Sequence, residues 1–322
     1  MKNLLNVKSL IILIIGFATL TSCDNDDDNV YVPETISEIA AVTPELSSLV
    51  AALTKANLVQ TLDSPGEYTV FAPTNEAFQA FLTTNGFASL NDVPVSALTQ
   101  ILLNHVVLGK NVSTNLSTGY VNTLATFGTT SLNLSMFINT ADGVELNGVS
   151  SVILADVTAT NGVVHVVDAV IGLPTVVTFA LADPNFDVLV AALTRESTFT
   201  FVNTLSTANG TAPAPFTVFA PTNTAFVNLL TELSLSSLAD VPTETLAATL
   251  TMHVVAGANV QASGLSNNLT IGTLGGDITA NVTGGATLTD ANDRVSNITF
   301  TDVQAANGVI HVINKVILPP LL

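Results

Sequence analysis

Apolar residues recur every three or four positions in two stretches of the chain that share the segment LVAALT, at residues 49–54 and 189–194. This spacing places the apolar side chains on one face of a helix. A capping residue and a proline precede each stretch, at residues 43–44 and 183–184, where they suit the first turn of a helix. The pattern therefore predicts two amphipathic helices of the same design.

Further helices and then strands follow in each half of the chain. Thr74 and Thr222 are candidate N-caps of a second helix, and a third apolar stripe comes after it. Beyond these helices apolar and polar residues alternate, as they do on half-buried strands. Each half closes on a nearly continuous apolar run, at residues 163–171 and 309–318. Because helices cluster early and strands late, we expect an α+β fold.

The chain repeats itself at the length of a domain. TVFAPTN occurs at residues 69–75 and 217–223, an offset of 217 − 69 = 148, whereas solenoid repeats are roughly 20–50 residues long. Downstream, NGVVHVV begins at Asn161 and its counterpart NGVIHVI begins at Asn307. The pattern indicates a tandem duplication in which each copy serves as a control for the other.

The duplication sets domain boundaries at residues 34–173 and 176–320. We interpret residues 172–182 as a short apolar link without a Ser/Gly tract, and we expect a fairly fixed relation between the domains. The LVAALT segments are 189 − 49 = 140 residues apart, so the second copy carries about 148 − 140 = 8 extra residues before its TVFAPTN motif. Gly, Pro and Asn place this insertion in a loop at residues 207–215.

The first residues form a targeting segment. Lys2 and Lys8 flank the start of an apolar run that is shorter than the roughly 20 residues of a membrane span. The run ends in LTSC at Cys23, the only cysteine of the chain, and this sequence resembles the lipobox of bacterial lipoproteins. We expect a lipoprotein signal peptide at residues 1–22 and membrane attachment through a lipid on Cys23. An ordinary secretion signal with an incidental cysteine is the alternative.

An acidic stretch, DNDDDN, follows at residues 24–29 and is interpreted as part of a solvated tether over residues 23–33. It does not match a calcium-binding EF-hand loop, because Asn29 and Thr35 stand where that loop has Gly and Glu. It resembles the export signal of Bacteroidetes-type lipoproteins. That resemblance implies an outer-membrane location facing the cell exterior.

The negative net charge of the chain limits the classes of partner that it can bind. The net charge is −18, and removal of Lys2 and Lys8 with the signal peptide leaves 5 − 25 = −20. Such a chain lacks the clustered Lys and Arg that neutralise phosphates, which excludes a nucleic-acid partner and disfavours anionic lipid surfaces. Because no His/Cys cluster has zinc spacing, we expect no metal and no cofactor, with calcium as a minor alternative.

All four histidines occur as repeat mates, His105 with His253 and His165 with His311. Catalytic sites in duplicated proteins often decay in one copy, so their presence in both copies favours a structural role. Neither a G-x-S-x-G elbow nor a phosphate-binding loop occurs in the sequence. We therefore expect no enzymatic activity and no small-molecule substrate.

Polar repeat mates are also interpreted as structural. Asp156 and Asp302 precede the last strand and suit bonds to local backbone amides, with a glycosidase-type carboxylate pair as the alternative. Asn75 and Asn223 suit the turn after the TVFAP strand. The motif residues that we assign to the architecture are Thr69, Pro73, Thr74, Asn75, His105, His165, Thr217, Pro221, Thr222, Asn223, His253 and His311.

The repeated motifs resemble those of the fasciclin-type (FAS1) domain family. The first family motif matches TVFAPTNEAF at residues 69–78 and TVFAPTNTAF at 217–226, and the second matches residues 161–171 and 307–317. The resemblance covers roughly residues 34–320. It implies two wedge-shaped β-sandwiches with helices packed at one end, in a mostly extracellular family associated with adhesion and protein–protein contact.

Many members of that family have Tyr immediately before the middle histidine, where Asn104 and Met252 stand here. The receptor binding tied to that Tyr-His region is therefore not carried over. Positions that differ between the copies are the candidate binding residues: Asn104, Met252, Thr207 and Pro215. We expect a surface adhesion protein that engages a protein or glycan partner. The alternative is an accessory lipoprotein of an outer-membrane complex for nutrient uptake or export.

Overall fold

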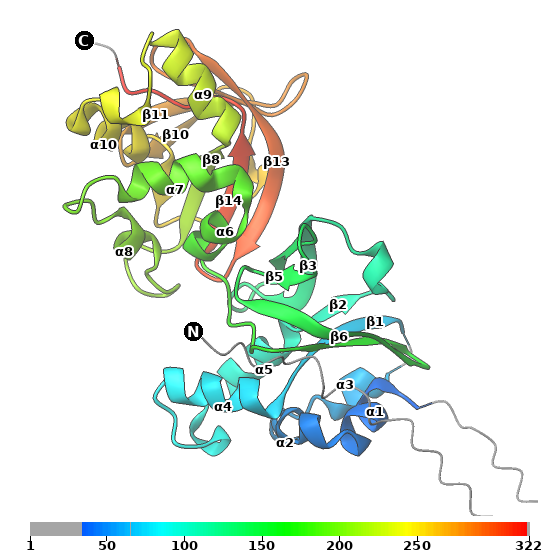
Figure 1. Cartoon of the computed structure of the whole chain (residues 1–322). Helices are drawn as coiled ribbons and strands as arrows, with labels where there is room; N and C mark the ends of the chain where they lie inside the picture. Colours follow the sequence, from blue (N-terminus) through cyan, green and yellow to red (C-terminus); the bar gives the residue numbers. More distant parts are fainter. Residues whose placement is uncertain (1–33, 65, 321–322) are drawn as a thin grey trace, which may run out of the picture. The chain divides into compact units, whose positions relative to one another are not determined.

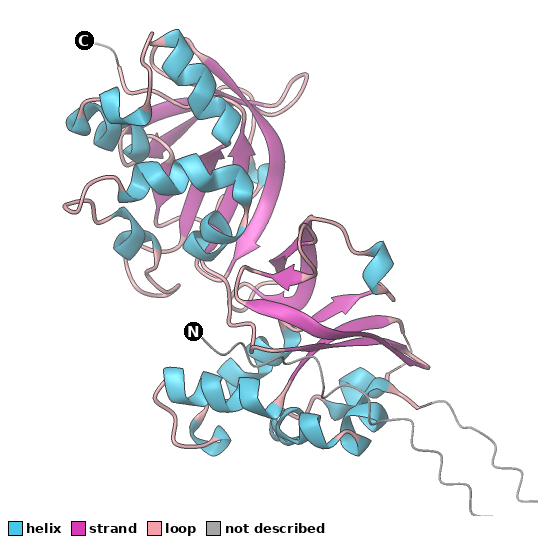
Figure 2. Ribbon diagram, in the orientation of Figure 1, coloured by secondary structure: helices cyan, strands magenta, loops and turns pink. Residues whose placement is uncertain are grey.

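The computed structural model describes residues 34–64 and 66–320. The predicted signal peptide, Cys23 and the acidic tether lie outside the described residues. Figure 1 shows the elements in chain order, and Figure 2 shows that most helices of each domain gather on one side of its strands.

Domain 1 begins with helices and ends with strands, as predicted. Its helices are α1 (Ile36–Val42), α2 (Ser47–Lys55), α3 (Val59–Asp63), α4 (Asn75–Thr84) and α5 (Val95–Leu103), with 3-10 turns η1 (Pro44–Leu46), η2 (Leu90–Asp92) and η3 (Ser113–Asn115). Its strands are β1 (Tyr68–Pro73), β2 (Val106–Leu108), β3 (Gly119–Thr126), β4 (Asn133–Asn139), β5 (Glu145–Leu146), β6 (Ser150–Ala159) and β7 (Gly162–Val167). The strands pair in chain order, and β7 pairs with β1 to close a barrel.

Domain 2 repeats this succession. Its helices are α6 (Val176–Ala182), α7 (Asp187–Thr194), α8 (Phe201–Leu205), α9 (Asn223–Glu232) and α10 (Thr243–Thr251), with 3-10 turns η4 (Pro184–Phe186), η5 (Leu238–Asp240) and η6 (Ala262–Gly264). Its strands are β8 (Phe216–Pro221), β9 (Val254–Ala256), β10 (Leu269–Thr273), β11 (Gly276–Asn281), β12 (Thr287–Thr289), β13 (Val295–Ala305) and β14 (Gly308–Ile313). They form a seven-stranded sheet in the order β10-β11-β12-β13-β14-β8-β9.

Each domain has two core layers, because side chains alternate across the strands. In β1, Val70 and Ala72 pack against the helices, whereas Phe71 packs among the strands with Met136 and Val167. Domain 2 divides its core between helix-facing and strand-enclosed clusters in the same way. The architecture confirms the predicted α+β fold, with a β-rich wedge and helices packed against it.

The predicted capping residues act as caps with one exception. The hydroxyl of Thr74 accepts the N–H of Ala77, Thr222 does the same in α9, and the carboxylate of Asp183 accepts the N–H of Asn185. Thr43 holds the cap position of η1, but its side chain makes no cap hydrogen bond. The predicted loop at residues 207–215 lies between α8 and β8.

The interpretation of residues 172–182 as an interdomain link is wrong for most of its length. Helix α6 starts after Thr175, whose hydroxyl exchanges capping-box bonds with Thr178. It buries Val176, Phe179 and Ala182 in the core of domain 2. A seven-residue helix that starts on two β-branched valines gives little periodic signal, and its cap was the one local sign of it.

Parallel pairing of the TVFAPTN strand with the NGV[VI]HV[VI] strand joins the repeated motifs of each domain. Tyr68 lies opposite Gly162 in the β1–β7 pair. A Cβ on Gly162 would lie 2.0 Å from the carbonyl oxygen of Tyr68, so only glycine permits this approach. Just before it, the side chain of Asn161 accepts the N–H of Ile36 at 3.0 Å and donates to the carbonyl of Leu62. One asparagine thereby holds α1 and α3 to the sheet.

The described residues of the two domains belong to one compact unit. The hydroxyl of Tyr120 donates to Oδ2 of Asp183 at 3.0 Å, and its ring meets Phe179 edge-on at 5.5 Å. Burial, and then the Asp183 carboxylate, raise the pKa of Tyr120, which therefore remains a donor. The N–H of Gln304 also donates to Oγ of Ser135 at 3.0 Å.

Within the described part of the chain, no single helix is long and apolar enough to cross a bilayer. Two sharply bent helix pairs, α1 with η1–α2 and α6 with η4–α7, pass that test by length and composition alone.

We predict that Gly162→Ala destabilises domain 1 by roughly 3 kcal/mol, because the added Cβ meets the backbone of Tyr68 at a positive φ of 154°. Gly172→Ala is the matched control, since nothing lies within 4 Å of its added Cβ, and it should change stability by less than about 0.5 kcal/mol. Urea unfolding followed by circular dichroism measures both. Equal midpoints for the two variants would contradict the prediction.

Candidate functional site

His105 and His253 fasten the end of a helix to the last segment of their own domain. Nδ1 of His105 donates to the carbonyl oxygen of Ile101 at 2.7 Å, and Nε2 accepts the N–H of Ile171 at 2.9 Å. His253 makes the same two bonds, to the carbonyl four residues earlier and to the N–H of Ile317. Burial lowers the pKa of both rings to about 4, so both are neutral near pH 7. With both nitrogens bonded to backbone, neither ring is positioned as a base or a ligand.

His165 and His311 form the second pair and lie within β7 and β14. Nε2 of His165 donates to the carbonyl oxygen of Asn111 at 2.9 Å, and Nδ1 accepts the N–H of Asp156 at 3.2 Å. Its ring stacks on Phe71 with centroids 5.5 Å apart. His311 makes the corresponding bonds and stack in domain 2. Both side chains are 0% exposed, so neither can meet a solute from the surface.

Asp156 and Asp302 sit at bulges in β6 and β13, where their φ angles are 65° and 61°. Oδ1 of Asp156 accepts the N–H of Ser113 at 2.7 Å, and the hydroxyl of the same serine donates to Oδ2. The side-chain bond first, and then the backbone bond, lower the pKa of Asp156. Asp302 accepts the N–H of Ala262 at 2.7 Å. The two aspartates accept bonds from backbone amides as predicted, but these amides belong to 3-10 turns distant in sequence rather than to a local turn.

Ser113, Asp156 and His165 have the residue types of a hydrolytic triad, but their bonds run in the wrong order. In a triad the serine hydroxyl donates to the imidazole. Here it donates to the aspartate, while both imidazole nitrogens bond to backbone groups. Domain 2 keeps the aspartate and the histidine but has Ala262 at the serine position. The aspartate and the histidine therefore hold a β-bulge in both domains, and the serine contributes to it only in domain 1.

The predicted role of Asn75 and Asn223 in holding their own turns is wrong. Oδ1 of Asn75 accepts the N–H of Ser48 at 2.8 Å, and Nδ2 donates to the carbonyl oxygen of Pro44 at 2.9 Å. Asn223 bonds to the matching groups before α7. Each amide therefore joins the helix after TVFAP to the neighbouring helix.

Thr69 and Thr217 hold the strand on the other side of the same motif. The hydroxyl of Thr69 donates to the carbonyl oxygen of Gly109 at 2.6 Å and accepts the N–H of Asn111 at 2.9 Å. Thr217 bonds the corresponding loop of domain 2. Pro73 and Pro221 end the two strands.

Asn104 and Met252, proposed from sequence as binding candidates, are each 0% exposed. The amide of Asn104 donates to the carbonyl oxygen of Gly172 at 3.0 Å and accepts the hydroxyl of Thr123 at 3.2 Å. Thr123 is the residue of β3 that pairs with β2. Met252 instead packs in the strand-enclosed core of domain 2, against Gly275. The substitution therefore lies beside the β2–β3 pairing, whose counterpart β9–β10 is absent from the sheet of domain 2. Neither side chain reaches a surface that a partner could touch.

Thr207 and Pro215, the other two candidates, are half-buried at the two ends of the inserted loop, and residues 208–213 between them are exposed. The loop borders a groove of about 400 Å³ that continues along Gln100 and Thr126 of domain 1. Asn209 lies on the loop side of this groove. The groove is lined by amide and hydroxyl side chains and by apolar residues that include Leu173 and Ala306, and by no charged residue. This lining suits a neutral partner that combines apolar contact with hydrogen bonds from peptide amides or sugar hydroxyls.

The part of the chain that the structure describes contains no group of three or more His, Cys, Asp or Glu side chains placed to hold a metal ion.

A model of the Fasciclin domain family matches residues 44–174 and again residues 184–319. The chain belongs to this family and carries two tandem fasciclin (FAS1) domains. Both matches contain the parallel strand pair and the two buried histidines described above.

Individual relatives match one domain or both. Protein sll1483 of Synechocystis sp. is 40% identical over 137 residues, which are 42% of this chain and 72% of that protein. Transforming growth factor-beta-induced protein ig-h3 of Sus scrofa is 29% identical over 265 residues, which are 80% of this chain and 35% of that protein. A solved FAS1 domain pair from the insect cell adhesion molecule fasciclin I matches with a TM-score of 0.53 and 22% identity, covering 86% of this chain and 97% of that chain. This last likeness is one of fold.

We predict that each domain loses about 2 kcal/mol of stability between pH 7 and pH 5 through His105 or His253. The pKa of each ring is lowered from 6.5 to about 4 on folding, so the unfolded chain takes up the proton first. Stability is therefore complete above pH 6.5 and falls as the pH drops toward 4. Urea unfolding at both pH values measures the loss.

His105→Gln is the test variant, because glutamine can donate and accept hydrogen bonds but does not titrate. It should flatten the pH dependence of the domain 1 transition and leave that of domain 2 unchanged. An unaltered slope in domain 1 would show that another group causes the effect.

Proposed function

We propose that the protein is a cell-surface adhesion protein without enzymatic activity, which binds a protein or glycan partner. One observation carries the proposal. The polar side chains that both domains share bond to backbone groups inside the fold, whereas the inserted loop is exposed at 208–213 and borders an uncharged groove. The part of the surface that can recognise a partner is therefore the part that differs between the two copies.

Relatedness gives further support. The FAS1 domain pair of fasciclin I belongs to a molecule described as an insect cell adhesion molecule. A pair of such domains can present loops at a distance from a membrane. We propose that a lipid on Cys23 and the acidic tether at 23–33 hold the two domains on the outer face of the outer membrane.

We predict that Ala208→Arg with Asn209→Arg weakens attachment of cells to their target surface at least about tenfold, a change of about 1.4 kcal/mol. Both positions are exposed and line the groove, so two long charged side chains would fill it without disturbing the core. Thr84→Arg with Ala88→Arg is the matched control, since it adds the same charge at exposed positions of domain 1. Equal attachment by both variants would contradict a binding role of the loop.

We predict that Cys23→Ala moves the protein from the membrane fraction to the soluble fraction, because the lipid would be its only anchor. Immunoblotting of fractionated cells measures the shift, and protease treatment of intact cells carrying the parent protein reports whether the domains face the exterior. Retention of the variant in the membrane fraction would refute the lipid anchor.

The second candidate function is that of an accessory lipoprotein in an outer-membrane complex for nutrient uptake or export. It is favoured by Val149, Ile153 and Leu154 at and beside the start of β6, which are 55%, 54% and 52% exposed. Affinity purification from detergent-solubilised membranes separates the two functions. A stoichiometric membrane partner supports the complex, and its absence together with groove-dependent attachment supports adhesion.

A further inference from the structure

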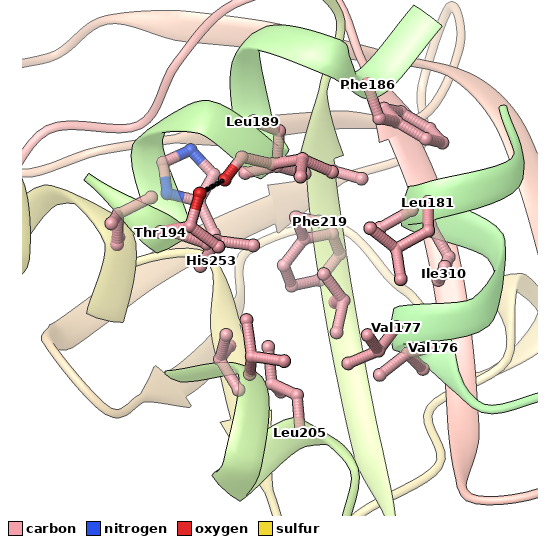
Figure 3. A pocket seen from close by; sticks show the side chains of 18 residues that line it. Val176, Val177, Leu181, Phe186, Leu189, Thr194, Leu205, Phe219, His253 and Ile310 are labelled. Atoms are coloured by element: carbon pink, nitrogen blue, oxygen red, sulfur yellow. Dashed lines mark hydrogen bonds between the residues drawn. The ribbon is translucent and has the colours of Figure 1, made fainter. Parts of the chain in front are cut away.

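Domain 2 contains an apolar pocket of about 100 Å³ between its first three helices and its sheet. Figure 3 shows side chains converging on it from α6, α7, α8 and β8. Val176, Leu189, Leu205 and Phe219 form part of the wall, and His253 lines one side. The lining is apolar except for Thr194 and His253.

The polar side chains that line the pocket already have partners. The hydroxyl of Thr194 donates to the carbonyl oxygen of Val190 at 2.8 Å. Both ring nitrogens of His253 bond to backbone groups. A ligand with a charged or hydrogen-bonding group inside the pocket would lose its water without gaining a partner there. The pocket therefore selects an apolar group.

The pocket opens toward solvent beside α6. Leu181 lines it and is 65% exposed, although most leucines of this domain are buried or half-buried. Val177 of α6 and Val202 of α8 are half-buried on the same lining. An opening bordered by aliphatic side chains admits the apolar end of a ligand, while a polar end of the same ligand remains in water.

Domain 1 has a polar latch at the corresponding position. There the hydroxyls of Thr35 and Ser37 donate to Oδ1 of Asp63, which ties α1 to α3. The matching residues of domain 2 are Thr175, Val177 and Ser206. The two hydroxyls bond locally instead, Thr175 to Thr178 and Ser206 to the carbonyl oxygen of Val202.

The connection between the second and third helices also differs. It spans residues 56–58 in domain 1 and residues 195–200 in domain 2. Both differences lie beside the part of the pocket that Val177 of α6 and Val202 of α8 line.

We propose that this pocket binds the end of an alkyl chain, from a free fatty acid or from a membrane lipid. Its volume is comparable to that of the roughly 150 Å³ apolar cavity known to bind a small hydrocarbon in a protein core. Each methylene that enters should tighten binding about fourfold, until the pocket is full. The alkyl chain is a bound ligand rather than a substrate, and the proposal does not depend on the adhesion function.

The test uses the full chain with Cys23→Ala, so that neither its own lipid nor detergent competes for the pocket. Hexanoate, octanoate and decanoate, each below its micelle concentration, are titrated by calorimetry. We expect about a 15-fold gain in affinity for each added pair of methylenes, levelling off when the pocket is full. Ala180→Phe adds a ring at a half-buried position of the lining and should weaken decanoate binding at least tenfold.

Ala41→Phe is the matched control, at an exposed position of α1 in domain 1, and should leave binding unchanged. Leu181→Asp is a second blocking variant at an exposed site, for use if Ala180→Phe fails to fold. Sedimentation with phosphatidylcholine vesicles separates the sources: vesicle binding that Leu181→Asp abolishes indicates a lipid acyl chain, and decanoate binding alone indicates a free chain. Absence of decanoate binding, or equal binding by parent and blocked variants, overturns the proposal.

Discussion

The parallel pairing of β1 with β7, and of β8 with β14, is the constraint on which each domain depends. It sets TVFAPTN and NGV[VI]HV[VI], about ninety residues apart in sequence, side by side in one ladder. A glycine permits the close approach, the preceding asparagine holds two helices, and the histidine of β7 or β14 bonds a loop on one side and a bulge on the other. The two family motifs therefore form one structural unit, and a substitution in either motif affects the packing of both.

The sequence was sufficient to predict this scaffold but not its long-range bonds. Periodicity and repetition predicted the helix and strand succession, and Thr74 and Thr222 were recognisable as caps because a cap bonds within its own helix. The partners of Asn75 lie some thirty residues away in another helix, so local rules assigned it to its own turn. Helix α6 was missed because it is short and is stabilised by packing rather than by periodicity.

The candidate site was harder to predict. A residue that differs between the two copies does not reveal whether its side chain faces the core or the solvent. Asn104 and Met252 differ chemically, yet both are buried at the end of the corresponding helix. Asn104 bonds to Thr123 of β3, the strand that pairs with β2, and Met252 fills the core of an open sheet. The inserted loop could be located from the length difference together with its Gly, Pro and Asn content, since extra residues between two fixed elements lie at the surface.

Two kinds of divergence thus coexist on one scaffold. The loop at 207–215 adds polar surface beside a groove, which changes what the protein can touch. Replacement of the Ser37–Asp63 latch by Val177 and Ser206 instead leaves an apolar opening inside domain 2. Because the strand pair and its asparagine hold α6 and α8 independently of that latch, the opening arises without loss of the fold. Duplication allows this specialisation, since domain 1 has the latch while domain 2 lacks it.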